Sequence, residues 1–176
     1  MATKTETTTS RMIPRRIKQF ALLSLVASSS IFCTQKQTGS FSEFQSTNGD
    51  WKATDVKKFT FEQNDSTANH SIYLNLQANN DYPFSNIFLI TKIHTPSEQS
   101  YTDTLQYAMT DEYGKLLGYG LTDTKTSKLL YKENYKFKEN GVYTIEIEQA
   151  VRKADEIEGT PTLKGITSVG LTIEKQ

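Results

Sequence analysis

The feature that most limits the fold of this chain is an alternation of apolar and polar residues with a period of two. Residues 72–76 form one such run, and residues 143–147 form another. Alternation of this kind is typical of strands with one buried face. The run at residues 87–93 is apolar in both phases, which predicts a strand buried on both faces. These runs predict an all-β fold.

Turn-forming residues separate the runs, for example at residues 79–81, 95–97, 140–141 and 159–161. Seven or eight short antiparallel strands with turns between them are typical of a β-sandwich or jelly roll. Hydrophobic residues make up only 36% of the chain, but nine Tyr and nine Phe supply bulk for a core. We therefore predict a single β-sandwich or jelly-roll-like domain over residues 51–176.

The first 32 residues have the composition of an export signal. Arg15, Arg16 and Lys18 precede an apolar run at residues 20–27. That run is too short for the ~20 residues that a membrane-spanning helix needs. A basic flank followed by a short apolar stretch is typical of a secretory signal. We expect residues 1–32 to be a cleaved signal segment.

The only cysteine, Cys33, stands at the end of this segment. A single cysteine cannot form an internal disulfide, and its position predicts a thiol that is acylated. Lipoprotein signals usually carry a small residue before the cysteine, whereas this chain has Phe32, so an ordinary secretory signal or a retained anchor, with an incidental cysteine, stays open. Residues 33–50 are rich in Thr, Ser, Gln and Gly, and we expect them to be the lipidated N-terminus and a flexible tether.

The charge balance and the motif search exclude several classes of function. Residues 33–176 hold 15 basic and 19 acidic residues, a net charge near −4, whereas nucleic-acid binding requires a basic stripe. The two histidines, His70 and His94, have no cysteine or carboxylate at zinc-ligand spacing. Glu146 and Glu148 are two residues apart and share the solvated face of a strand. We predict no catalytic residues, no metal, no cofactor and no nucleic-acid partner.

Five aromatic or apolar residues near turns are candidates for a contact surface: Tyr82, Phe84, Tyr113, Leu117 and Tyr119. Tyrosine offers a large apolar face with a hydroxyl, which suits stacking on sugars or anchoring a protein interface. Covering the open ends of the sandwich is the alternative explanation for these side chains.

Several short segments follow one another in a fixed order along the chain: Cys33, Trp51, Phe59-Thr60-Phe61, residues 79–86, residues 103–105, residues 114–118, residues 131–134, residues 141–143, residues 148–152 and residues 169–171. In this order and spacing they resemble the GldH family of gliding-motility lipoproteins from Bacteroidetes. The resemblance covers essentially all of residues 33–176 and departs from the family at Phe32. It implies a non-catalytic outer-membrane lipoprotein that is needed for gliding and associated with the type IX secretion machinery.

The resemblance also implies a membrane anchor through a lipid on Cys33, with other gliding and secretion envelope proteins as partners. Surface-exported lipoproteins of this phylum often carry acidic residues after the cysteine, and residues 34–37 have none. We therefore expect the domain to face the periplasm. A lipid-tethered carbohydrate-binding β-sandwich is the alternative, favoured by the aromatic residues near turns.

Two tripeptides, Asp103-Thr104-Leu105 and Asp65-Ser66-Thr67, resemble the short O-glycosylation signal of Bacteroidetes envelope proteins. They make Thr104 and Ser66 candidate glycosylation sites. The alternative is that Thr104 is an unmodified strand residue.

Overall fold

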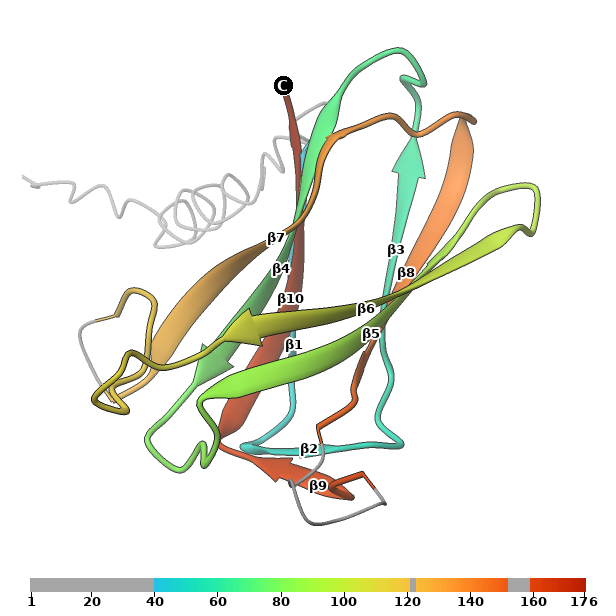
Figure 1. Cartoon of the computed structure of the whole chain (residues 1–176). Helices are drawn as coiled ribbons and strands as arrows, with labels where there is room; N and C mark the ends of the chain where they lie inside the picture. Colours follow the sequence, from blue (N-terminus) through green and yellow to red (C-terminus); the bar gives the residue numbers. More distant parts are fainter. Residues whose placement is uncertain (1–39, 121–122, 152–158) are drawn as a thin grey trace, which may run out of the picture. The chain divides into compact units, whose positions relative to one another are not determined.

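The computed structural model describes residues 40–120, 123–151 and 159–176 (Figure 1). The regular structure of these residues is entirely β, and the pairings between the strands are antiparallel. The predicted all-β class is therefore confirmed. The expected signal segment, residues 1–32, and Cys33 lie outside the described residues.

Two four-stranded sheets form a sandwich, and a short two-stranded pair, β2-β9, lies at one end (Figure 1). The first sheet has the order β1-β10-β4-β7 and the second has the order β3-β8-β5-β6. The strands are β1 (Phe41–Ser46), β2 (Asp50–Lys52), β3 (Lys57–Gln63), β4 (His70–Ala78), β5 (Asn86–His94), β6 (Ser100–Ala108), β7 (Lys125–Tyr135), β8 (Gly141–Gln149), β9 (Thr162–Lys164) and β10 (Ile166–Lys175). The two main sheets thus hold eight strands, and the short pair adds two to the number predicted.

The core lies between the two main sheets. The alternating runs at residues 72–76 and 143–147 face it from β4 and β8, one in each sheet. Fully burying one aliphatic or aromatic side chain stabilises a fold by about 1.5–3 kcal/mol, so these inward faces hold the sheets together. In β5, one face is buried, while Phe88 and Ile90 on the other are half-buried rather than buried as predicted.

The folded unit begins earlier than the sequence indicated. Residues 33–50 were expected to be a flexible tether, but β1 (Phe41–Ser46) pairs along its whole length with β10. The pattern hides this strand because β1 is an edge strand whose residues are half-buried or exposed, so it shows no clean alternation. The part of the expected tether that precedes residue 40 lies outside the described residues.

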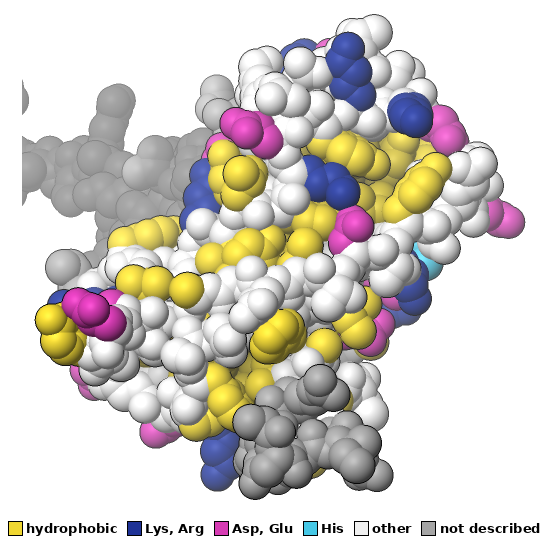
Figure 2. All heavy atoms as spheres, viewed as in Figure 1, with side chains coloured by type: hydrophobic (Ala, Val, Ile, Leu, Met, Phe, Trp, Pro, Cys, Tyr) yellow, Lys and Arg dark blue, Asp and Glu magenta, His cyan; other side chains and the backbone are white. Residues whose placement is uncertain are grey.

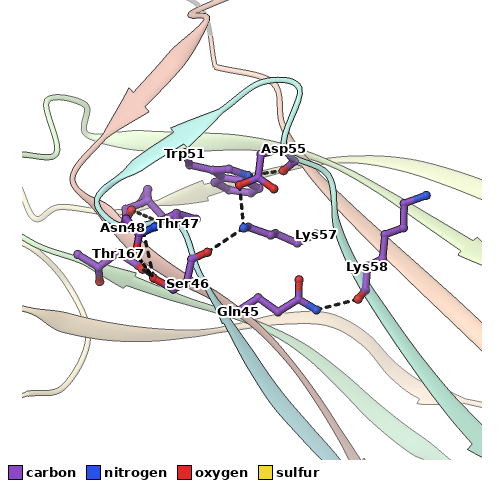
Figure 3. A network of polar contacts seen from close by, with 10 residues as sticks. Gln45, Ser46, Thr47, Asn48, Trp51, Asp55, Lys57, Lys58 and Thr167 are labelled. Carbon is purple, nitrogen blue, oxygen red and sulfur yellow. Dashed lines mark hydrogen bonds and ion pairs between the residues drawn. The ribbon is translucent and has the colours of Figure 1, made fainter.

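On one side of the sandwich, side chains close the gap between β1 and β3, the edge strands of the two sheets (Figure 3). The buried Lys57 ammonium donates to the Ser46 carbonyl at 2.8 Å and pairs with the Asp55 carboxylate at 2.7 Å. The Gln45 amide donates to the Lys58 carbonyl at 2.8 Å. Unpaired buried charges are costly, so this network fixes β1 against β3.

A buried histidine at the start of β4 is held in its neutral form. The side-chain oxygen of Gln63 accepts from the backbone N–H groups of Asn64 and Asp65, so its amide nitrogen is the group that faces His70 Nε2, at 3.2 Å. Nε2 must then accept a hydrogen bond, which only a neutral ring can do. Burial, the largest cause, lowers the pKa of His70.

We predict that the domain loses stability as the pH falls from 7.5 to 5.5. The unfolded His70 takes up a proton near its ordinary pKa of about 6.5, whereas the folded ring resists protonation, so acid favours the unfolded chain. The His70→Gln variant, which cannot be protonated, should lose this slope in urea unfolding followed across the pH range. The matched control is His94→Gln, which removes the other histidine. A His70→Gln slope equal to that of the wild type would contradict the assignment.

Candidate functional site

The long connection between β6 and β7 contains three of the five residues predicted to form a contact surface. Its first part is a tight hairpin, in which Leu117 N–H donates to the Met109 carbonyl at 2.8 Å. The carboxylate of Asp111 accepts from the backbone N–H groups of Tyr113, at 3.0 Å, and Lys115, at 2.9 Å. The turn is therefore held by its own hydrogen bonds, and Tyr113 lies at its tip.

The second part of this connection returns along β7. Tyr119 and Thr126 exchange backbone hydrogen bonds of 3.0 and 2.8 Å. Gly118 makes this approach possible, because its φ is +107° and a Cβ at this position would lie 2.4 Å from the Thr126 carbonyl oxygen. The side chains of Tyr113, Leu117 and Tyr119 are all exposed, Tyr113 by 87%. We name these three residues the loop patch.

The other two predicted contact residues do not belong to this surface. Tyr82 is only 7% exposed and donates from its hydroxyl to the Asn86 carbonyl at 2.7 Å, and burial raises its pKa. Phe84 is half-buried against the core, with its ring 6.0 Å from that of Tyr82. The prediction that Tyr82 is an exposed contact residue was wrong. The structure supports the alternative, that it covers an end of the sandwich.

A groove of about 260 Å³ opens between the two sheets on the side opposite the β1 and β3 edges. It lies between β6 of one sheet and the end of β7 in the other. Figure 2 shows hydrophobic and basic side chains interspersed on this face of the molecule. Its lining includes three tyrosines and three lysines: Tyr101, Tyr135, Tyr143, Lys132, Lys136 and Lys138.

Two side chains of β6, Asp103 and Tyr107, contact β7 across this opening. The Asp103 carboxylate accepts from Lys132 at 2.9 Å and from the Tyr131 hydroxyl at 2.7 Å. The Lys132 ammonium, and after it the Tyr131 hydroxyl, lower the pKa of Asp103. The Tyr107 hydroxyl donates to the Leu130 carbonyl at 2.8 Å, and burial raises the pKa of Tyr107 to about 12. Asp103 thus bonds to side chains of β7, and Tyr107 bonds to its backbone.

This groove was not predicted from the sequence. Its lining residues alternate along strands, for example Tyr101 and Asp103 in β6. The sequence feature that could have indicated it is a set of aromatic residues on the inner face of strands, close to lysines. These residues form one groove only because of the strand order, which makes both β6 and β7 edge strands on the same side of the sandwich.

A wider, polar depression of about 900 Å³ lies near the β2-β9 pair. Its described lining includes Asn48, Asp50, Asn79, Asp81 and Lys164, and no aromatic side chain. Sugar recognition commonly uses aromatic side chains as stacking surfaces. The carbohydrate alternative therefore has no aromatic platform in this depression.

Several acidic residues of the described region are engaged in ion pairs and turns. Glu146 pairs with Lys58 at 2.8 Å and lies 3.4 Å from His94, and Lys58 is the main cause that lowers its pKa. Among residues 40–120, 123–151 and 159–176, no three His, Cys, Asp or Glu side chains are grouped as a metal site. In the same residues, no helix is long and apolar enough to cross a membrane.

The two candidate glycosylation residues occupy different surroundings. Thr104 is exposed in the middle of β6. Ser66 is half-buried in a turn where the Asp65 carboxylate accepts from Thr67 N–H at 3.0 Å and pairs with Lys175 at 2.7 Å. Lys175 is the largest cause that lowers the pKa of Asp65. Thr104 is thus the more accessible of the two.

Comparison with known proteins identifies relatives along nearly the whole chain. The model of the GldH lipoprotein family matches residues 39–173. The gliding motility lipoprotein GldH of Flavobacterium johnsoniae is 44% identical over 161 residues, covering 92% of this chain and 99% of that protein. A GldH homolog of Christiangramia forsetii is 43% identical over 143 residues, covering 81% of this chain and 86% of that protein.

Solved structures offer only a distant likeness. The VP2 subviral particle protein of infectious bursal disease virus aligns with a TM-score of 0.38 and 13% identity. The alignment covers 76% of this chain and 31% of the viral chain.

We predict that Gly118→Ala destabilises the domain more than Gly114→Ala does. Both glycines have positive φ, but a Cβ at Gly114 meets nothing within 4 Å, whereas one at Gly118 clashes with the Thr126 carbonyl. Strained backbone conformations cost of order 1–3 kcal/mol, and the clash adds to that cost only at Gly118. Urea unfolding of the two variants measures the difference. Equal stability of the two would show that the β6–β7 connection moves freely at Gly118.

Proposed function

The chain belongs to the GldH lipoprotein family, and we propose that it is a non-catalytic accessory component of the gliding-motility and type IX secretion machinery. The observation that carries this proposal is the similarity to a gliding motility lipoprotein over almost the full length of both chains. An exposed loop patch and a groove between edge strands support a role in surface contact with other envelope proteins.

We place the protein at the outer membrane, anchored by a lipid on Cys33 and facing the periplasm. Export by the signal segment, residues 1–32, would expose this cysteine for acylation. More than one acyl chain is needed for stable anchoring. Because β1 begins at Phe41, only residues 34–40 separate Cys33 from the first strand.

Replacing Cys33 with Ser tests the anchor and the function together. In a strain that lacks the native gene, the wild-type chain should restore colony spreading and secretion, and Cys33→Ser should restore neither, because the unanchored protein leaves the membrane fraction. Labelling with a fatty-acid probe should disappear in the variant. Unchanged labelling would contradict acylation at this residue, and a deletion strain that glides and secretes normally would contradict the proposed function.

Intact-mass measurement of the wild-type protein from native membranes tests whether the protein is O-glycosylated. A mass above that of the lipidated chain, removed by Thr104→Ala or Ser66→Ala, supports O-glycosylation at these residues. A mass equal to that of the lipidated chain contradicts it.

We propose the loop patch, in particular Tyr113 and Tyr119, as a contact surface for partner proteins. Tyrosines at interface hot spots contribute ~2 kcal/mol or more each, which corresponds to roughly 30-fold in affinity. The variants Tyr113→Ala and Tyr119→Ala should therefore lose copurification with secretion proteins while unfolding at the wild-type urea concentration, because exposed side chains add little to the core.

The matched control is Val142→Ala, which removes an exposed apolar side chain from β8. It should keep every partner. Tyrosine variants that remain folded and keep every partner would contradict a role for the loop patch. If they lose binding to a polysaccharide instead, the carbohydrate-binding alternative takes the place of the proposal.

A further inference from the structure

The two main sheets have four edge strands, and three of these edges are covered or interrupted. The edges of β1 and β3 lie against each other, joined by the Gln45 and Lys57 hydrogen bonds. The β7 edge is irregular, because its register with β4 shifts at Ile72, and its Leu130 carbonyl already accepts from Tyr107. Such devices are how proteins prevent edge strands from pairing with other chains.

The fourth edge, β6, is connected to β7 by its Asp103 and Tyr107 side chains, but no side chain of the described residues bonds to its outward backbone groups. It is nine residues long, contains no proline and pairs with β5 without a register shift. Its single charged residue, Asp103, is bonded to Lys132 and Tyr131. A long, regular edge of this kind presents a row of unpaired N–H and C=O groups.

The hydrogen bonds at both ends of the β5–β6 hairpin identify which groups point outward. Thr95 N–H donates to the Gln99 carbonyl, and Met109 N–H donates to the Ser85 carbonyl. Bonded and non-bonded pairs alternate in an antiparallel ladder, so the odd-numbered residues of β6 bond to β5. The backbone groups of Thr102, Thr104 and Gln106 therefore point away from the sheet, and β6 has no other neighbouring strand in the described structure.

A strand added to this edge would continue the inner face of its sheet, and alternate side chains would enter the groove beside β6. Tyr101 of β6 and Tyr135 of β7 line that groove and suit an apolar or aromatic side chain. Of the groove's acids, Asp103 is bonded to Lys132, and Glu139 accepts from Ser97 at 2.9 Å.

The groove also has two exposed lysines available to a partner. Lys136 and Lys138 make no ion pair with any residue of the described part of the chain. The groove holds three lysines and two acids, Asp103 and Glu139, and Lys132 already pairs with Asp103, so a net charge of +1 remains beside the β6 edge. Complementary charge steers partners and fixes register, so an occupant with carboxylates is favoured.

We propose that the β6 edge binds an extended segment of a partner protein as an additional strand, with an apolar or aromatic side chain in the groove and acidic side chains near Lys136 and Lys138. Main-chain hydrogen bonds supply affinity and the groove supplies specificity in this mode of recognition. The inference deepens the proposed function, because it names the surface and the chemistry of one partner contact.

The test uses the full-length, membrane-anchored protein in a strain that lacks the native gene, with a photo-crosslinking amino acid at Gln106. Thr104→Pro removes one outward N–H, and proline is tolerated where an edge N–H faces solvent. It should lower the yield of the protein crosslink at least tenfold and impair spreading. Thr104→Ala keeps the N–H and, like Thr104→Pro, lacks the hydroxyl of the candidate glycosylation residue, so it is the matched control against which the loss in yield is measured.

A second variant changes the groove without touching the edge. Lys136→Glu combined with Lys138→Glu replaces two exposed side chains, so the fold should be unaffected and the crosslink yield should fall severalfold. Urea unfolding of each purified variant verifies the fold. If Thr104→Pro does not fold, the lysine variant alone decides the outcome.

Three results would overturn the inference while the proposed function stands. One is a folded Thr104→Pro or lysine variant that crosslinks and spreads like the wild type. Another is a crosslink to a second copy of this chain, and the third is the absence of any protein crosslink. A deletion strain that spreads and secretes normally would instead overturn the proposed function.

Discussion

The structure depends on the burial of one face of each main sheet against the other, because neither sheet alone can remove its apolar side chains from water. The alternating residues of β4 and β10 meet those of β8 and β5 in one core. This arrangement fixes which side chains face outward, and it leaves each sheet with two edges whose backbone groups must be paired, covered or solvated.

The edge strands are joined differently on the two sides of the sandwich. On the β1 and β3 side, Lys57 and Gln45 join the edges through backbone carbonyls, and Phe41 and Phe61 pack with ring centroids 5.3 Å apart. On the other side, polar contacts from Asp103 and Tyr107 span the opening without filling it. The groove, the free edge of β6 and the connection that carries the loop patch all belong to β6 and β7. The features suited to partner contact therefore lie along these two strands, with the loop patch at the end of β6 and the groove near its start.

The sequence predicted the strand class and much of the core, because Ile145 and Ile147 follow a simple alternation that burial of one face imposes. It misplaced Tyr82, whose neighbours Asp81 and Pro83 are typical of an exposed turn. In the fold, Gly165 has no Cβ and lets the backbone at Tyr82 approach, since an added Cβ would lie 2.2 Å from the Tyr82 nitrogen. The groove was not predictable, because it depends on strand order, which no local pattern encodes.

Amide hydrogen exchange, compared between the isolated domain and the protein in its detergent-solubilised membrane complex, tests most directly whether the β6 edge is the partner surface. We expect slower exchange at Thr102, Thr104 and Gln106 in the complex, because a new strand would bond their outward N–H groups. Exchange at the β1 and β3 edges should stay the same. Unchanged exchange along β6, or protection confined to β1 and β3, would contradict the binding of a partner strand at the β6 edge.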